Sequence, residues 1–231
     1  MARPSVSCSL TLLGPQDQID AFKARCLRER DGAPAFDFGA LVPLPPEIAA
    51  IDRDDLCAPL YAAAFAVVKR IQPDPKAWTT LSPATHDLMV RTARMLQGAG
   101  PDFSLDQIEK KLHEAGDRPG RDLLADGQLY LAALEKHGVL TALEWRDEHW
   151  GVPFNATDVE LIEDRPGALS FSFETKSAPP TPIFTAIARA FPGLQGEAAA
   201  ENADTWRYEA TFKGDEVAGR CIELGEEALE P

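Results

Sequence analysis

The sequence predicts an α+β fold, in which an antiparallel sheet is covered by helices and interrupted by a large all-helical insertion. Three observations lead to this class and to the division of the chain into segments. Alternation of apolar and polar residues, typical of half-buried strands, occurs in the two outer parts of the chain. Helical periodicity alone occupies the part between them, and the end of the chain is acidic. We therefore predict a core built from residues 1–48 and 141–225, a helical insertion lobe over 50–140 and an acidic tail over 226–231.

The first outer segment opens with a strand and a helix. Residues 5–13 alternate, with the apolar positions Val6, Cys8, Leu10 and Leu12 and the polar positions Ser5, Ser7, Ser9 and Thr11. Gly14-Pro15 ends this strand, and apolar residues at helical spacing then predict an amphipathic helix over 16–30. The stretch 32–46 is rich in proline and glycine, and we expect it to be a packed loop because it carries Phe36 and Phe38.

The middle of the chain shows only helix signals. Asp54 or Asp55 can cap a helix through Ile71, and Ser82-Pro83 can open another. Ser104 and Gln107 form a capping box, and Pro119 begins a further apolar run that ends at Gly138. We expect four helices here.

The second outer segment returns to strands. Residues 157–163 and 169–174 alternate on either side of Arg165-Pro166-Gly167, which indicates a hairpin whose first strand turns Val159 and Leu161 inward. A helix is expected next, from Thr181-Pro182 to Phe191, where Pro192-Gly193 stops it. Residues 206–213 alternate as the last clear strand, with 217–224 as a candidate partner.

The order of these elements points to one arrangement. Without residues 50–140, the chain reads β-α-β-β-α-β with one extra strand. That order is the ferredoxin-like split βαβ arrangement, an antiparallel sheet with helices on one face.

Charge narrows the classes of function. The chain carries a net charge of −14, with 23 basic and 37 acidic side chains. Binding to nucleic acid depends on clustered cations that neutralise phosphates, so direct nucleic-acid binding is disfavoured. The same surplus of carboxylates suits a protein that mimics nucleic acid. No apolar run reaches the length that a bilayer requires, and no secretory signal is evident, so we expect a cytoplasmic protein without a membrane partner.

Motifs for cofactors and metals are missing from the sequence. The four cysteines, Cys8, Cys26, Cys57 and Cys221, form no C-x-x-C pair. The four histidines, His86, His113, His137 and His149, are scattered, and the common nucleophile and phosphate-binding signatures do not occur. We therefore expect no cofactor and no bound metal.

One short segment contains several aromatic, charged and titratable side chains of the kinds that bind ligands or act in catalysis. Residues 145–151, Trp-Arg-Asp-Glu-His-Trp-Gly, stand where the predicted insertion rejoins the sheet. We take Trp145, Arg146, Asp147, His149 and Trp150 as candidates for binding a ligand or partner, since loops between layers often bind ligands. His149 beside Asp147 or Glu148 could also serve as an oriented base. The alternative is that both indoles pack in the junction and their polar neighbours face water.

Several segments of the chain resemble the Api92-like proteins, which contain the YubB ferredoxin-like domain. They are residues 9–15, Phe36-Asp37-Phe38 followed by Val42-Pro43-Leu44-Pro45, Trp150-Gly151 with Asn155-Ala156, and Leu169 to Leu194. The resemblance covers about 5–48 and 143–222. It adds Asn155 to the candidate site and implies a setting in a phage, plasmid or integrated element, without implying an activity.

The chain departs from the family at two tryptophans. Where the family has T-A-W-S-P-P this sequence has Thr175-Lys176-Ser177-Ala178-Pro179-Pro180, and where it has T-K-W this sequence has Val152-Pro153-Phe154. Any binding role of those indoles therefore does not carry over.

Three functions follow from the sequence. The first is a non-enzymatic accessory protein that acts through a protein partner. The second is an acidic nucleic-acid mimic that inhibits a host defence or DNA-processing protein. The third is a hydrolase or transferase that uses His149 with Asp147 or Glu148.

Overall fold

The computed structural model describes residues 4–30, 32–51, 61–63, 65–66, 123–202, 205–214 and 216–223. The chain divides into two compact units. The first unit joins residues 1–43 to residues 146–231, and the second unit is residues 44–145. Most of the predicted insertion lies outside the described residues, including the two helices predicted from Ser82 and from Ser104 and all but residues 61–63 and 65–66 of the first.

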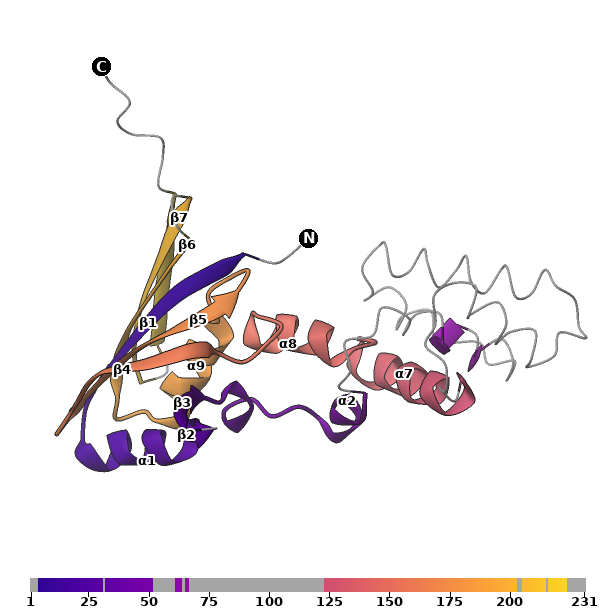
Figure 1. Cartoon of the computed structure of the whole chain (residues 1–231), viewed down its shortest axis with the longest axis horizontal. Helices are drawn as coiled ribbons and strands as arrows, with labels where there is room; N and C mark the ends of the chain where they lie inside the picture. Colours follow the sequence, from indigo (N-terminus) through magenta and orange to yellow (C-terminus); the bar gives the residue numbers. More distant parts are fainter. Residues whose placement is uncertain are drawn as a thin grey trace, which may run out of the picture. The chain divides into compact units, whose positions relative to one another are not determined.

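The first unit is built on a six-stranded sheet (Figure 1). Its strands are β1 (Ser5–Leu13), β4 (Thr157–Arg165), β5 (Ala168–Lys176), β6 (Gln195–Asn202), β7 (Trp206–Lys213) and β8 (Glu216–Glu223). They lie in the order β4-β5-β1-β6-β7-β8, and every neighbouring pair is antiparallel. The predicted α+β class with an antiparallel sheet is therefore confirmed.

Helices pack on one face of this sheet. Helix α1 (Gln16–Cys26) contacts β5, and helix α9 (Thr181–Ala190) contacts β6, β7 and β8. Directly opposite residues of antiparallel strands share a face, and the register places Leu10 between Phe171 and Ala198, all three buried. Phe22 of α1 packs against Phe171 at a ring-centroid distance of 6.2 Å. The inward alternation predicted for β1 and β5 is confirmed.

The helix predicted over 16–30 is shorter than expected. It ends at Cys26, and Leu27–Arg30 forms strand β2, which pairs with β3 (Ala33–Phe36). This hairpin carries Phe36 into the core, where its ring lies 5.2 Å from that of Phe171 and 5.3 Å from that of Phe173. Burial of the Phe36 ring against residues far away in the sequence stabilises this hairpin more than the weak local preference of 27–30 stabilises a helix. The segment predicted as a loop thus contains β3 and a short 3-10 helix, η1 (Phe38–Ala40).

Strand β6 was missing from the sequence prediction, which assigned the strand after α9 to residues 206–213. Its residues Gln195–Asn202 are mostly alanine, glycine and glutamate, which have low strand propensity. The structure requires small residues there: a Cβ on Gly196 would lie 1.8 Å from the Phe212 ring on β7. Phe212 lies directly opposite Gly196, so its ring covers the glycine.

Strand β4 also differs from its prediction. It is an edge strand with register shifts between Thr157 and Glu160 and between Leu161 and Glu163. Leu161, predicted to point into the core, is 50% exposed, and Val159 is only partly buried. Leu161 nevertheless lies directly opposite the buried Phe171, on the helix-covered face, and it is exposed because β4 is at the edge of the sheet.

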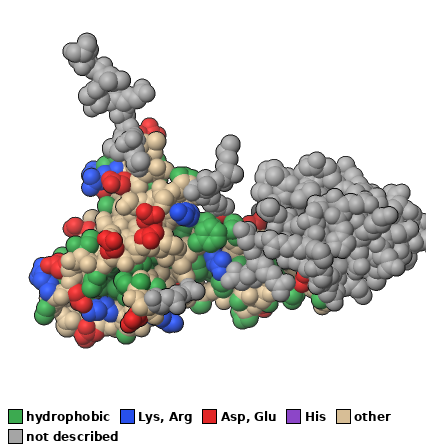
Figure 2. Space-filling view, in the orientation of Figure 1, with side chains coloured by type: hydrophobic (Ala, Val, Ile, Leu, Met, Phe, Trp, Pro, Cys, Tyr) green, Lys and Arg blue, Asp and Glu red, His purple; other side chains and the backbone are tan. Residues whose placement is uncertain are grey.

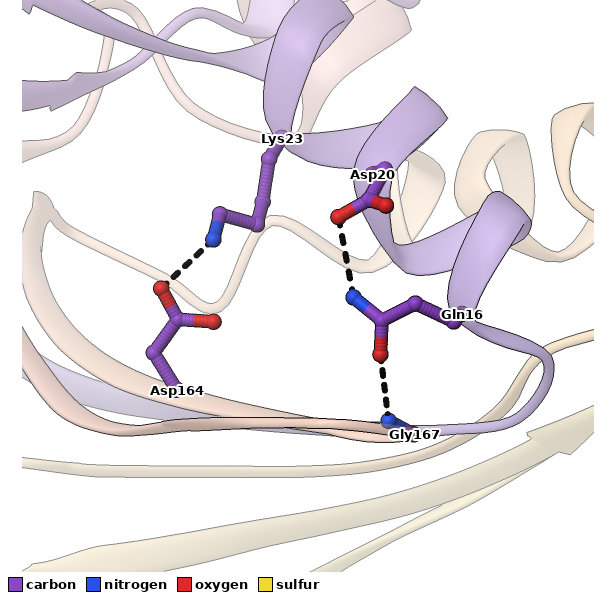
Figure 3. A network of polar contacts seen from close by, with 5 residues as sticks. All are labelled: Gln16, Asp20, Lys23, Asp164 and Gly167. Atoms are coloured by element: carbon purple, nitrogen blue, oxygen red, sulfur yellow. Dashed lines mark hydrogen bonds and ion pairs between the residues drawn. The ribbon is translucent and has the colours of Figure 1, made fainter.

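The N-terminus of α1 is tied to the turn between β4 and β5 (Figure 3). Gln16 accepts from the Gly167 amide at 2.7 Å and donates to Asp20 at 2.9 Å. One turn further along, Lys23 forms an ion pair of 2.5 Å with Asp164 of β4. These contacts fix the helix over the strands that it covers.

The second unit is helical where it is described. Helix α2 (Pro46–Ala50) contacts α7 (Leu123–His137), and residues 61–63 and 65–66 are also helical. The run predicted to end at Gly138 corresponds to α7, and Gly138 takes a positive φ of 74°. Glu47 of α2 pairs with Lys136, and its carboxylate lies 3.3 Å from Nε2 of His137.

Glu47 should make stability depend on pH in acid. Hydrogen bonds from Lys136, and secondarily from the backbone and His137, lower the pKa of Glu47 from 4.5 to about 2. A carboxyl with a lowered pKa stabilises the fold above its unfolded value and loses that contribution as the pH falls through the folded value. We expect Glu47→Gln to lose less stability than the wild type between pH 4.5 and about 2.

Chemical denaturation at several pH values across this window measures the difference. Glu135→Gln is the matched control, since Glu135 is exposed on α7, next to Lys136, the residue that pairs with Glu47. Equal acid sensitivity of the wild type and Glu47→Gln would rule out this role for the contact.

Candidate functional site

The tryptophan-rich segment lies on a helix, not in a loop as predicted. Helix α8 (Ala142–Trp150) begins with a capping box: the Thr141 hydroxyl accepts from the Glu144 amide at 3.1 Å, and Glu144 accepts from the Thr141 amide at 3.2 Å. The division between the two units falls between Trp145 and Arg146. Both tryptophans are buried, with 5% of Trp145 and 3% of Trp150 exposed.

Trp150 packs inside the first unit. Its indole N–H donates to the Val42 carbonyl at 2.8 Å, and its ring meets Phe38 edge to face at 5.8 Å. The Arg146 guanidinium lies 5.3 Å from the ring centroid, within the range of a cation–π contact. The indole is thus held by contacts with its own chain on its edge and on its ring.

Asn155 has a structural role next to Trp150. Its side-chain oxygen accepts from the Phe38 amide at 2.8 Å. Arg25 of α1 donates to the Ala40 carbonyl at 2.9 Å, and Asp37 accepts from the Gly39 amide at 3.0 Å. Together with the Trp150 bond, these side chains satisfy polar backbone groups of residues 38–42, which no ladder could satisfy. We call residues 36–42 the clamped loop.

The clamped loop unites segments that are far apart in sequence. Residues 36–42, Trp150 and Asn155, which carry part of the family resemblance, come together around Phe38. Gly151 continues this packing: it has a positive φ of 79°, and a Cβ there would lie 2.9 Å from Pro182. The packing around Phe38 therefore gives Trp150, Gly151 and Asn155 structural roles in the first unit.

The positions of the two family tryptophans lie at the surface. Phe154 is 43% exposed, and Ser177 is exposed with a positive φ of 77°. A larger side chain at either position would therefore face outward.

Asp147, Glu148 and His149 occupy successive positions of α8. Successive residues of a helix are turned by about 100°, so Asp147 and His149 leave it on nearly opposite sides. Glu148 is exposed, whereas Asp147 and His149 are partly buried. Glu148 is turned by about 100° from His149, and residues one or two positions apart on a helix do not face each other, so α8 turns neither predicted carboxylate toward His149.

The buried cysteines are poor nucleophiles. Burial raises the pKa of Cys8 to about 11 and that of Cys26 to about 12. The reactive form is the thiolate, which is scarce at neutral pH for such groups. Cys221 is exposed, and Cys57 lies outside the described residues. No group of three or more potential metal ligands occurs in the described part of the chain, which leaves out His86 and His113.

The face of the sheet opposite the helices is a surface that sequence reasoning identified only in part. We call it the open face. Its central strand β1 presents Ser7, Ser9 and Thr11, flanked in register by Ser170, Ser172 and Glu174 of β5 and by Glu197, Ala199 and Glu201 of β6. Arg207, Glu209 and Thr211 of β7 extend it. The sequence showed the polar positions of β1 and β5, but the carboxylates of β6 depend on a strand that was not predicted.

Shallow grooves run along the open face. One of about 400 Å³ is lined by Ser9, Thr11, Glu197, Arg207, Glu209 and Thr211, among others. A second groove, of about 240 Å³, has a lining that includes Ser7, Ser9, Ser172, Glu201 and Arg207. Hydrogen bonding from Arg220 lowers the pKa of Glu209, which keeps this carboxylate charged. Figure 2 shows acidic and basic side chains interspersed on the visible surface of the first unit.

Comparison with known proteins finds a similar solved structure but no matching family. No family model matches the chain, and no curated protein matches it. The chain is similar to the crystal structure of protein api92 from Yersinia pseudotuberculosis at 12% sequence identity, over 100% of both chains, with a TM-score of 0.46. Within the described residues, no helix has the length and apolar character needed to cross a membrane.

Truncating Trp150 should destabilise the first unit. Trp150→Ala removes a buried indole, which costs about 3 to 5 kcal/mol. Trp150→Phe keeps a ring against Phe38 but leaves the Val42 carbonyl without its donor, and we expect a smaller loss of about 1 to 3 kcal/mol. Glu148→Ala, at an exposed position of the same helix, should change stability by less than about 0.5 kcal/mol. Equilibrium urea unfolding measures all three, and an unchanged midpoint for Trp150→Ala would contradict the packing role.

Asn155 should protect the Phe38 amide. Asn155→Ala removes the acceptor of this hydrogen bond, so we expect faster hydrogen exchange at Phe38 and a loss of about 1 to 3 kcal/mol. Asn155→Asp retains an oxygen acceptor and serves as the matched control, with exchange close to the wild type. Equal protection in Asn155→Ala and the wild type would show that the bond does not hold the loop.

Proposed function

We propose that this is a non-catalytic accessory protein that binds a protein partner on the open face of its sheet. The observation that carries the proposal is the chemistry of that face. It combines hydroxyl groups of β1 and β5 with the glutamates Glu174, Glu197 and Glu201. Glu197 lines the larger groove and Glu201 the smaller one, and both grooves lie open along the strands. Sites for small molecules are mostly enclosed and apolar, whereas polar surfaces of this kind suit protein partners.

The charges of the open face favour a partner segment rich in lysine and arginine. Arg207 and Arg220 both pair with Glu209, at 3.1 Å and 2.7 Å. No ion pair engages Glu197 or Glu201 within the described residues. Carboxylates in this state attract cationic side chains and speed the encounter with a basic partner.

The same features disfavour nucleic acid as the direct partner. The central carboxylates repel phosphates, and the strands that the structure describes place no aromatic ring on the open face for stacking of bases. A partner that itself binds nucleic acid would make the protein a nucleic-acid mimic, and identification of the partner decides between the two functions. Catalysis by His149 with Asp147 or Glu148 is disfavoured because residues one or two positions apart on a helix do not face each other.

We further infer that the core is a ferredoxin-like split βαβ arrangement. The strands β4-β5-β1-β6 correspond, in chain order, to the second, third, first and fourth strands of that arrangement, with α1 and α9 as its two helices. This order supports the inference. We also propose kinship with the Api92-like proteins and their YubB domain, and a setting in a phage, plasmid or integrated mobile element, on the residues quoted for the resemblance. The proposed site of action is the cytoplasm.

Charge reversal on the open face tests the proposed function. Immobilised wild-type protein, Glu197→Lys/Glu201→Lys and the control Glu29→Lys/Glu135→Lys are exposed to one bacterial lysate, and captured proteins are quantified by mass spectrometry. The control residues are exposed, lie outside the open face and undergo the same charge change. We expect one basic protein to be retained by the wild type and the control and lost, by about tenfold or more, from the open-face variant, because attraction becomes repulsion.

The proposed function fails if the open-face variant retains the same proteins as the wild type. It also fails if the wild type captures nothing beyond what the resin alone captures. Loss of binding in both double variants would indicate attraction by overall charge and would likewise contradict a defined surface.

A further inference from the structure

The outer edge of β8 is the feature of the sheet that the proposed function leaves unexplained. β8 is the last strand of the sheet and pairs with β7 without a break, from Trp206 opposite Glu223 to Lys213 opposite Glu216. In the part of the chain that the structure describes, no strand pairs with its other side. Such an edge presents backbone N–H and C=O groups to any strand that fits.

The opposite edge of the sheet differs. Register shifts interrupt β4, and β3 lies near it, both of which are common protections against pairing between molecules. β8 contains no proline and no register shift over its eight residues. The protection is therefore uneven, and β8 is the edge that stays regular.

The charges of β8 identify a second copy of this chain as the strand that fits. Two copies related by a two-fold axis pair antiparallel, and directly opposite residues share a face. The axis therefore passes midway between one residue and the same residue of the second copy, and each register is named here by that residue. With the axis at Ala218, Glu216 of each copy lies opposite Arg220 of the other, on the open face. Val217 then lies opposite Gly219 on the helix-covered face.

Other registers lack this match. An axis at Arg220 would oppose two guanidinium groups, and an axis at Gly219 would oppose Glu216 to Ile222. An axis at Val217, Cys221 or Ile222 opposes no glutamate of β8 to Arg220. Only the Ala218 register combines opposite charges across both halves of the strand pair.

Arg220 can serve both partners. It donates to Glu209 of its own chain from Nε at 3.2 Å and from Nη2 at 2.7 Å. A guanidinium has five N–H donors, so donors remain for the carboxylate of a second copy.

We propose that two copies of this protein pair along the outer edges of β8, antiparallel about Ala218, to form one continuous sheet. The pairing extends the open face across both molecules without using Glu197 or Glu201. It does not depend on the proposed partner, because its test contains this protein alone.

Sedimentation velocity over a concentration series tests the pairing. We expect the wild type to shift from monomer to dimer as concentration rises. Glu216→Lys places two lysines against two arginines in the Ala218 register, and we expect the dissociation constant to rise about tenfold. Glu223→Lys makes the same charge change on the same strand outside the paired residues 216–220, and we expect it to behave as the wild type.

Disulfide crosslinking tests the register. Ala218→Cys and, as a control, Thr211→Cys are each made in a background of Cys57→Ser and Cys221→Ser, and incubated with oxidised glutathione. Thr211 is exposed and lies directly opposite Ala218 on β7, one strand away from the predicted axis. We expect a disulfide-linked dimer from Ala218→Cys and little from Thr211→Cys.

The proposal is overturned by a monomer at every concentration up to the solubility limit. It is also overturned by a dimer that Glu216→Lys and Glu223→Lys weaken equally, or by equal crosslinking of the two cysteine variants. Dimer formation is measured on this protein alone, whereas partner binding is measured by its loss from Glu197→Lys/Glu201→Lys. Either proposal can therefore fail while the other stands.

Discussion

The central position of β1 is the constraint on which the rest of the first unit depends. This N-terminal strand pairs with β5 on one side and β6 on the other, and both come from the C-terminal part of the chain. Neither half of the unit can bury its apolar face alone, because the partners of Val6, Cys8, Leu10 and Leu12 lie more than 150 residues away. Closing so long a loop costs entropy, but the cost grows slowly with length, so a long segment can separate the two parts.

The aromatic core and the clamped loop follow from this pairing. Phe171 and Phe173 of β5 lie opposite β1, and Phe22, Phe36 and Phe38 complete the cluster from one side. Residues 37–42 follow the end of β3, and side chains of Arg25, Trp150 and Asn155 bond backbone groups of Ala40, Val42 and Phe38 there. Trp150, a candidate binding residue in the sequence analysis, therefore has a structural role, and we look for the functional surface on the sheet.

Those surfaces exist because β6 is built from small residues. Gly196 accommodates the Phe212 ring, and Ala198 and Ala200 are buried beside Leu10 and Cys8. On its other face, the same strand presents Glu197 and Glu201 beside the hydroxyls of β1. The open face and the β8 edge both depend on β6, which the alternating pattern did not show and which joins the predicted strands β7 and β8 to β1.

The sequence by itself determined the elements whose periodicity is local: the alternation of β1 and β5, the apolar face of α9 and the run that became α7. It also indicated the antiparallel α+β class. Only the tertiary structure decided that 27–30 pair as a strand, that β6 exists, that Leu161 is exposed at the sheet edge, and that Trp150 and Asn155 hold a loop. The reason is the same in each case. These features depend on contacts between residues far apart in the chain, such as Phe36 with Phe171 or Gly196 with Phe212, and local propensity carries no information about such contacts.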